Sequence, residues 1–246
     1  MEDKERGSFV FKRLKHNKVK RDYLLYVPPT YSKRNKSSVV LNFHGYGSTA
    51  SSHLYYSDWR DLSNEHGFIL IYPQGLALEY GGYHWNPDPP SSDNKSFSND
   101  LGFVDKLIKK VSSKYFVDPS RIYATGFSNG AGMAYGLARH RSDLIAAVAP
   151  VSGLASTKHL STTSGVSPVG LISFNGSDDW ERPLSGVPGY LASVVDLSEY
   201  WSAINHSEHH RLETFNQGSR RPVEKTLFSR ESGNVTVEQY VIQGGG

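Results

Sequence analysis

The sequence predicts an α/β fold built on a mostly parallel central sheet with helices on both faces, and two observations support this prediction. Short apolar runs, typical of strands buried inside a parallel sheet, alternate along the chain with segments of helical periodicity. One run begins at Ile122 and leads into a Gly-x-Ser-x-Gly motif at 126–130, after which small residues continue as a helix. Glycines around a serine at a strand-to-helix turn permit a tight backbone that exposes the hydroxyl. We therefore predict that Ser128 is a nucleophile.

The other elements follow in chain order. Strands are expected at 9–14, 19–27, 39–43, 68–72, 146–151, 169–174 and 235–242, and helices at 54–66, 100–115 and 192–204. The helix at 100–115 carries one apolar stripe at Leu101, Val104, Leu107, Ile108 and Val111. Asp118-Pro119 is expected to break this helix before the nucleophile strand. Residues 206–222 are polar and are expected to form a loop.

Composition limits the classes of function. The 246 residues suit one domain, residues 1–246, with a sizeable core, and the net charge is only +3. Basic residues gather in the first 36 positions among strand-like apolar residues, which favours a solvated strand face over a nucleic-acid site. The chain has no cysteine, so disulfides and thiolate metal sites are excluded. Neither a membrane span nor a signal segment is recognised, so we expect no membrane partner and a cytoplasmic chain.

Two loops should border the serine. After strand 39–43 comes a glycine-rich turn, and we place an oxyanion hole at the backbone amides of Tyr46 and Asn129. If the glycine-rich turn after strand 39–43 stood alone, an ordinary glycine-rich loop would be the alternative interpretation. His44 precedes Ser128 in the chain, so we expect it to support the loop on the substrate side rather than act as a base. In the long loop 75–98, Trp85 either offers aromatic surface to substrate or pins the loop to the core.

The acid and the base have expected positions behind the serine. In an α/β-hydrolase arrangement the acid follows the second strand after the nucleophile strand, which selects Asp178 or Asp179, and the base follows the last strand. His206, His209 and His210 lack the carboxylate spacing of a metal site, so a solvated basic loop is favoured, with a substitute base as a remote alternative. Nothing in the sequence implies a metal or an organic cofactor.

The elbow at 123–133 closely resembles the polyhydroxybutyrate depolymerase / feruloyl esterase family, in the LpqC-like branch of the α/β hydrolases. Further motifs fit this family over nearly the whole chain: His44-Gly45-Tyr46-Gly47, Tyr72-Pro73-Gln74-Gly75, Trp85-Asn86, the run 100–105, the run 117–123 and Val151-Ser152-Gly153. The resemblance implies a serine esterase that acts on feruloyl or acetyl groups of plant polysaccharide, or on hydroxyalkanoate polyesters. It also implies that Asp179 is the acid, with Asp178 in reserve.

Three features depart from the family pattern. Its members carry cysteine pairs, and this chain has none. Members are commonly secreted, but no signal segment is recognised here. The family's last motif resembles Gly-Gly-Gly-His followed by Trp-Pro, whereas this sequence ends at Gly246, the third glycine. We interpret the chain as an incomplete copy of an esterase that would be nearly inactive by itself, because the base is missing. The alternative is a catalytically dead module that binds carbohydrate or aryl-ester ligands.

Overall fold

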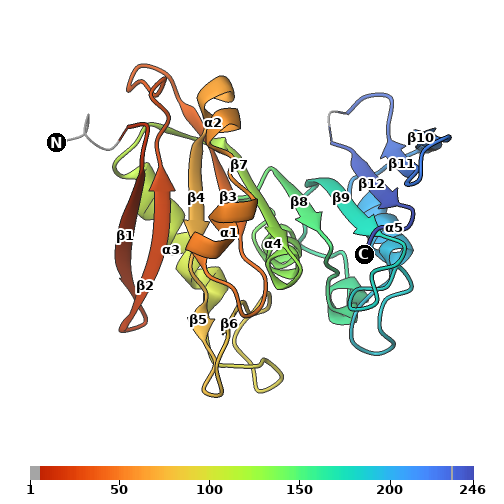
Figure 1. Ribbon diagram of the computed structural model, residues 1–246, viewed down its shortest axis with the longest axis horizontal. Coiled ribbons are helices and arrows are strands. Elements are labelled where there is room, and N and C mark those ends of the chain that lie inside the picture. The colour runs from red at the N-terminus through yellow and green to blue at the C-terminus, as the bar shows by residue number, and fades with distance from the viewer. Residues whose placement is uncertain (1–5, 234) are drawn as a thin grey trace.

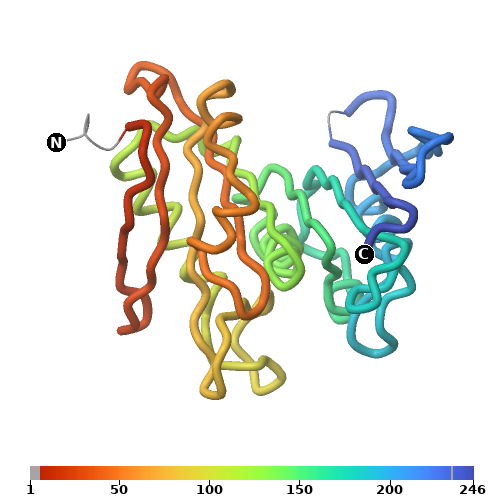
Figure 2. The backbone as a smooth tube through the Cα atoms, viewed as in Figure 1, coloured from red at the N-terminus to blue at the C-terminus, as the bar shows by residue number. Residues whose placement is uncertain are grey.

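The structure is a computed structural model that describes residues 6–233 and 235–246. Ten strands form one sheet in the order β1-β2-β4-β3-β7-β8-β9-β12-β11-β10, and a short hairpin, β5-β6, stands apart. The six strands from β4 to β12 run parallel, whereas β1 and β2 at one edge and β11 and β10 at the other pair antiparallel. Figure 2 shows these two terminal hairpins at opposite ends of the sheet. The prediction of a mostly parallel central sheet is confirmed.

The elements have these bounds. The strands are β1 Phe9–His16, β2 Val19–Tyr26, β3 Ser37–Phe43, β4 Ile69–Pro73, β5 Leu76–Ala77, β6 Tyr83–His84, β7 Val117–Phe127, β8 Ala147–Val151, β9 Gly170–Gly176, β10 His209–Phe215, β11 Val223–Ser229 and β12 Val237–Ile242. The helices are α1 Ala50–Tyr56, α2 Arg60–His66, α3 Asp100–Ser112, α4 Asn129–His140 and α5 Val194–Ile204, and η2 Thr157–Ser161 is a 3₁₀ helix. Within the described ranges, no helix combines the length and the apolar character needed to cross a membrane.

The sheet is covered on both faces, and β4, near the β1–β2 edge, is accordingly apolar and buried at every position. Along β2, Tyr23 and Leu25 belong to the larger core, whereas Leu24 and Tyr26 belong to a smaller core on the other face. Helices α3, α4 and α5 cover the larger core, and α1 and α2 lie over the smaller one (Figure 1). The predicted apolar stripe of α3 is buried, and burial of each such side chain contributes about 1.5–3 kcal/mol. Helices therefore cover both faces, as predicted.

The prediction of one helix over 54–66 is wrong, because α1 and α2 are separate helices. Ser57 ends α1 with non-helical backbone angles of φ −135° and ψ 57°. Its hydroxyl accepts a hydrogen bond from the Asn42 side chain at 3.2 Å, and its carbonyl accepts one from the Tyr72 hydroxyl. These contacts hold residue 57 against the sheet, so the chain turns and starts a second helix after Trp59.

Helix α3 ends at Ser112, before Asp118-Pro119, as expected, but the nucleophile strand begins earlier than predicted, since both residues lie inside β7. Beside β3 the register shifts there, because Ser37 pairs with Val117 while Val39 pairs with Ile122. The proline is tolerated because this irregularity removes it from the hydrogen-bonded ladder.

The predicted loop at 206–222 contains an edge strand instead. β10 pairs with β11 through seven residue pairs, from His209 opposite Ser229 to Phe215 opposite Val223. Most of β10 is exposed on both faces, so its sequence shows no alternation of apolar and polar residues. The strand is set by pairing with a neighbour, which a local pattern cannot reveal.

Candidate active site

Ser128 occupies the sharp turn between β7 and α4, with φ +53° and ψ −112°. This backbone conformation is unfavourable for any residue except glycine, and such strain persists only where the surrounding structure enforces it. The Ser128 N–H donates to the carbonyl of Val151 at 3.0 Å. A Cβ atom on Gly126 would lie 2.5 Å from the backbone of Gly130, and one on Gly130 would lie 2.3 Å from the carbonyl oxygen of Phe43. Both glycines are therefore needed for strand β3 to approach the turn.

The Ser128 hydroxyl is not used to cap its helix, although serine is a favoured N-cap. At the starts of α1, α3 and α5, the side chains of Thr49, Asn99 and Ser193 each accept a hydrogen bond from a backbone N–H of the first turn. Ser128 stands at the start of α4 and makes no such bond. The elbow instead presents the hydroxyl to two cavities, both of which Ser128 lines.

The two cavities lie on either side of the serine and share the wall formed by 180–182. The larger has a volume of about 1200 Å³ and extends under the loop that contains Asp88 and Lys95. The smaller has a volume of about 410 Å³ and is lined by Asp179 and Gly246. A group attached to Ser128 would therefore have space on one side and a carboxylate on the other.

The turn after β3 lies beside the serine, where the oxyanion hole is expected. A Cβ atom on Gly45 would be 3.7 Å from the Cβ of Ser128, and Tyr46 and Asn129 both line the larger cavity. Across residues 6–233 and 235–246, the backbone N–H groups of Tyr46 and Asn129 have no acceptor. The Ser48 N–H donates to the Gly45 carbonyl at 3.3 Å, which closes the turn. Both amides are thus available to a ligand oxygen.

Trp85 and His44 pack against the buried side of the turn after β3. The Trp85 ring is 1% exposed, and its Nε1–H donates to the His44 carbonyl at 3.0 Å. The main chain of Trp85 is held by the Asn129 side chain, whose Oδ1 accepts from its N–H at 2.7 Å and whose Nδ2 donates to its carbonyl at 3.1 Å. The buried ring supports pinning of the loop, one of the two roles left open for Trp85. Trp85 also lines the larger cavity, so its role toward substrate stays a prediction.

His44 supports the loop, as expected, but it does so from behind rather than on the substrate side, since its side chain is 0% exposed and lines neither cavity. The Gly45 carbonyl can only accept, so Nδ1 of His44 carries the proton that bridges their 2.7 Å contact. Nε2 then accepts from the Gly75 N–H at 2.9 Å. The imidazole therefore joins the turn after β3 to the start of the 75–98 loop.

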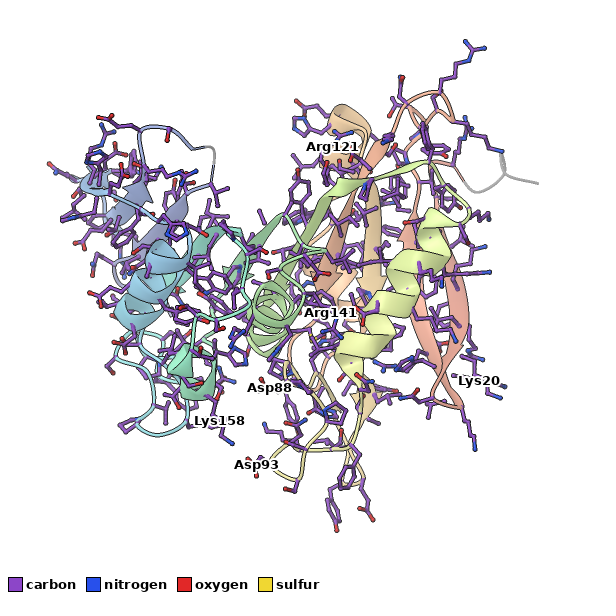
Figure 3. The ribbon with its side chains drawn as sticks, turned by 180° about the vertical axis from the view of Figure 1, so that it is seen from behind. Lys20, Asp88, Asp93, Arg121, Arg141 and Lys158 are labelled. Atoms are coloured by element: carbon purple, nitrogen blue, oxygen red, sulfur yellow. The ribbon has the colours of Figure 1, made fainter. Side chains whose placement is uncertain are left out.

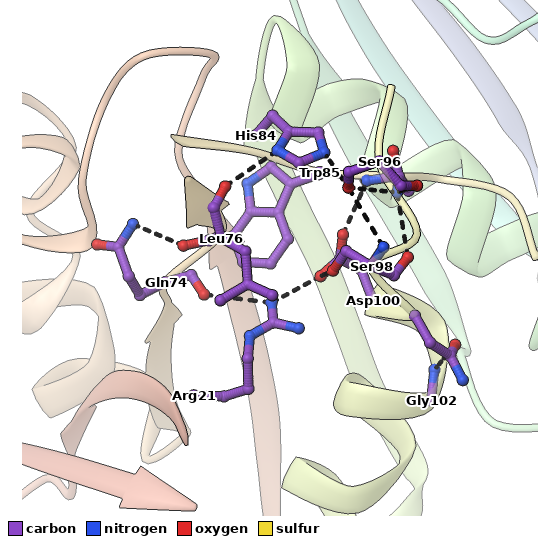
Figure 4. Close-up of polar contacts among 12 residues, drawn as sticks. Arg21, Gln74, Leu76, His84, Trp85, Ser96, Ser98, Asp100 and Gly102 are labelled. Carbon is purple, nitrogen blue, oxygen red and sulfur yellow. Dashed lines mark hydrogen bonds and ion pairs between the residues drawn. The ribbon is translucent and has the colours of Figure 1, made fainter. Parts of the chain in front are cut away.

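A polar network fixes the 75–98 loop (Figure 4). Asp100, at the start of α3, is completely buried and pairs with buried Arg21 at 2.6 Å. Its second oxygen accepts from the Asn86 N–H at 2.9 Å. The Ser96 hydroxyl contacts Nε2 of His84 at 2.9 Å. These bonds fix both ends of the loop segment that follows Trp85, and thereby one wall of the larger cavity.

Asp179 is held in one orientation at the carboxyl end of β9. Its Oδ1 accepts from the backbone N–H groups of Glu181 at 3.1 Å and Arg182 at 2.9 Å. Its Oδ2 accepts a hydrogen bond from the hydroxyl of Ser152. Asp178 is exposed, and among the described residues its side chain bonds only its neighbour Ser177. Asp179 is the better oriented carboxylate, and it lines the smaller cavity with Ser128.

Sequence reasoning assigned no role to Ser152, although Val151-Ser152-Gly153 is one of the motifs that fit the family. Ser152 has a positive φ of 46°, so its hydroxyl reaches Asp179 from the neighbouring strand end. A Cβ atom on Gly153 would lie 2.5 Å from the carbonyl oxygen of Ser128. The motif therefore packs against the nucleophile turn and orients the carboxylate. The position of Ser152 directly after strand β8 is the sequence feature that could have identified it.

None of the three C-terminal histidines approaches the serine. His209 and His210 are exposed on β10, at the edge of the sheet, and His206 is exposed just before it. His209 lies 4.0 Å from the carboxylate of Glu231. In the part of the chain that the structure describes, no histidine lines either cavity. The prediction that these histidines are solvated is confirmed, but they lie on and beside a strand rather than in a loop.

We expect the protein to lose stability as the pH falls from 7.5 to 5. Burial lowers the pKa of His44 to about 4, and it lowers the pKa of His53 to about 4 as well. The unfolded chain protonates these rings near pH 6.5, so between pH 6.5 and 4 it binds more protons than the folded chain. Each of these two histidines should therefore lower the free energy of unfolding at pH 5 by about 2 kcal/mol relative to pH 7.5.

Urea unfolding at the two pH values measures this loss. Between pH 7.5 and 5, the variant His53→Gln should lose less unfolding free energy than the wild-type chain. The variant His206→Gln, at an exposed site, should lose as much as the wild type. Equal unfolding free energies at pH 7.5 and pH 5 in the wild-type chain would contradict the prediction.

The fold is shared with solved structures. The structure titled acetyl xylan esterase from Aspergillus awamori superposes with a TM-score of 0.67 at 18% identity, and the match covers 96% of this chain and 93% of that chain. Together with the strand order, this likeness confirms the predicted α/β-hydrolase fold.

Sequence comparison identifies the family. A probable acetylxylan esterase A of Neosartorya fischeri is 28% identical over 180 residues, which are 73% of this chain and 43% of that protein. Feruloyl esterase B of Piromyces equi is 32% identical over 130 residues, which are 53% of this chain and 23% of that protein. The chain thus spans less than half the length of these relatives. The family described as esterase PHB depolymerase matches residues 21–176, which include Ser128 and the Asn129 clamp on Trp85. The chain belongs to the esterase PHB depolymerase family.

Proposed function

We propose that this chain is the catalytic domain of a serine carboxylic-ester hydrolase that works through an acyl-enzyme on Ser128. One observation carries the proposal: an uncapped serine on a strained elbow shares a cavity with Asp179, whose carboxylate is held by three hydrogen bonds. A carboxylate oriented in this way can hold an imidazole in one tautomer and stabilise the imidazolium.

The proposed reaction has two halves. The Ser128 Oγ attacks the ester carbonyl carbon while a histidine takes its proton, and the carbonyl oxygen becomes an oxyanion bound by the amides of Tyr46 and Asn129. The C–O bond to the alcohol then breaks, and the histidine returns the proton to the leaving alkoxide. Water, activated by the same histidine, attacks the acyl group and releases the acid and the free serine.

We assign the base to a histidine at the position directly after Gly246, which the family's last motif implies. Gly246 lines the smaller cavity together with Ser128 and Asp179. The end of the chain is fixed there, because the Asp178 N–H donates to the Gly245 carbonyl at 2.8 Å. A side chain at the next position would begin at the wall of the cavity that Ser128 and Asp179 share.

Two matched forms test this assignment: the chain extended after Gly246 by His-Trp-Pro, and the chain extended by Gln-Trp-Pro. General-base assistance predicts hydrolysis of p-nitrophenyl acetate and methyl ferulate about 10²–10⁴-fold faster in the first form. Equal turnover in both forms would mean that another group supplies the base. If neither form showed turnover that depends on Ser128, the chain would be a binding module instead.

For the substrate, we propose an acetyl or feruloyl ester carried by a polysaccharide, following the names of the relatives. Aromatic side chains around the larger cavity support a polymer: Tyr46 is 52%, Trp180 84% and Tyr190 55% exposed, and all three line it. Exposed aromatic faces next to a cavity provide apolar platforms with polar edges, which suit sugar rings.

Replacement of Trp180 by alanine should raise KM for a polymeric ester about 5-fold, the equivalent of about 1 kcal/mol of aromatic contact. KM for p-nitrophenyl acetate should change less, because this small ester can meet Trp180 only at the wall that the two cavities share. Tyr80→Ala is the matched control, since Tyr80 is 95% exposed but lines neither cavity. Steady-state kinetics of the His-Trp-Pro form on both esters measures the effect. Equal increases for the two esters would contradict a platform for polymer.

A further inference from the structure

We propose that Asp88, His140 and His159 form a binding site for a divalent transition-metal ion, with zinc as the best match. One carboxylate oxygen and two imidazole nitrogens, one atom from each residue, lie within 4.8 Å of one another. Asp88 belongs to the long loop over the larger cavity, His140 ends α4, and His159 lies in η2. The fold alone brings these segments together. This inference does not depend on the proposed esterase activity.

The spacing of the three atoms suits zinc. Oδ1 of Asp88 is 2.6 Å from Nε2 of His159 and 3.1 Å from Nε2 of His140. Bonds of about 2.0–2.2 Å to a tetrahedral ion would place these ligand atoms about 3.3–3.6 Å apart. The contact between Asp88 and His140 would lengthen by about 0.2–0.5 Å, and the contact between Asp88 and His159 by about 0.7–1.0 Å, which small side-chain rotations can supply. The two rings are 5.5 Å apart and cross at 89°, so their nitrogens approach the carboxylate from different directions. Two histidines and one carboxylate also occur as ligand sets of protein-bound zinc.

The chemistry of the three groups favours a cation. Asp88 is a partly buried carboxylate, 28% exposed, and two imidazoles face the same oxygen of it. His159 is 4% exposed, and its Nε2 is the ring nitrogen that faces Asp88. Without an ion, both imidazoles direct an N–H at the same carboxylate oxygen. An ion would replace both of these protons.

The site would stiffen the cavity wall rather than enter the reaction. A second contact already joins the same two segments, since Nζ of Lys158 in η2 lies 2.5 Å from a carboxylate oxygen of Asp93 in the loop. Figure 3 shows Asp88, Asp93 and Lys158 in the same region of the molecule. The Lys158 pair is exposed, with side chains about two-thirds accessible, so it holds the loop only weakly. An ion on Asp88 would provide the firmer connection.

Zinc titration of the chelator-dialysed, tag-free chain by calorimetry tests the proposal. We expect one ion per chain in the wild type, and affinity at least about 10-fold lower in Asp88→Asn and in His140→Gln. Zinc at about 100 times its dissociation constant should raise the melting temperature by roughly 5–10 °C in the wild type alone. Cobalt(II) should give the visible absorption of a tetrahedral site.

The exposed histidines supply the control. The double variant His209→Gln/His210→Gln should bind zinc like the wild type, because neither residue belongs to the site. His140 lies at the end of α4 and is partly exposed, so its glutamine variant should fold even if a change at Asp88 disturbs the loop, and circular dichroism checks this. The absence of saturable zinc binding in the wild type would overturn the proposal. Binding that is unchanged in folded His140→Gln, or lost in the control variant, would also overturn it.

Discussion

Replacement of Ser128 by alanine should abolish ester hydrolysis by the chain extended with His-Trp-Pro. The loss in kcat should approach about 10⁶-fold, as for nucleophilic serines in other hydrolases, because no acyl-enzyme can form without the hydroxyl. The residual rate of hydrolysis would come from substrate binding and from the backbone amides of the oxyanion hole. The folded structure should persist, since the Ser128 hydroxyl caps no helix end. Steady-state kinetics with p-nitrophenyl acetate measures the loss.

A second serine in the same cavity provides the control. Ser91 also lines the larger cavity but stands in the exposed loop, away from the elbow. Ser91→Ala should keep its activity within about twofold, because surface changes of this kind have small effects. A covalent phosphonate probe should label the peptide that contains Ser128 in the wild-type chain but not in Ser128→Ala. Labelling of any other serine, with activity retained in Ser128→Ala, would show that the nucleophile is elsewhere.

The elbow and the parallel strands could be predicted because their causes are local. Gly126 and Gly130 are required by contacts within a few residues of Ser128 and with the neighbouring strand, and the buried strands are apolar runs that a short window detects. The order of the strands indicated the loop that contains Asp178 and Asp179, and the family resemblance favoured Asp179. Strand β10 could not be predicted, because its polar residues are placed by pairing with β11 rather than by burial.

The polar parts of the site were the least predictable. Asp88, His140 and His159 are 52 and 19 positions apart along the chain, so no spacing rule for metal ligands could select them. Whether His44 binds substrate or supports a loop depends on burial, and the sequence contains no direct signal for the burial of one imidazole. In both cases contacts between distant segments decide the role.

The Arg21–Asp100 pair should show the largest effect on stability of any single polar contact described above. Both side chains are buried, with 1% and 0% exposed, and their atoms are 2.6 Å apart. Asp100→Ala would leave the guanidinium of Arg21 buried without its partner, which typically costs 3–5 kcal/mol, so we expect about 4 kcal/mol. The Asn86 N–H would lose its acceptor as well, and an unpaired buried donor adds to the cost.

Asp105 offers a control on the same helix. It pairs with Arg141 through two hydrogen bonds of 2.7 and 2.8 Å, but its side chain is 39% exposed, so Asp105→Ala should cost about 1 kcal/mol or less. Urea unfolding at pH 7.5 compares the two variants with the wild type. The double variant Arg21→Met/Asp100→Leu should regain part of the loss, because no charge remains buried. If Asp100→Ala cost no more than Asp105→Ala, water would be reaching Arg21, and the network would not be what holds the 75–98 loop against the sheet.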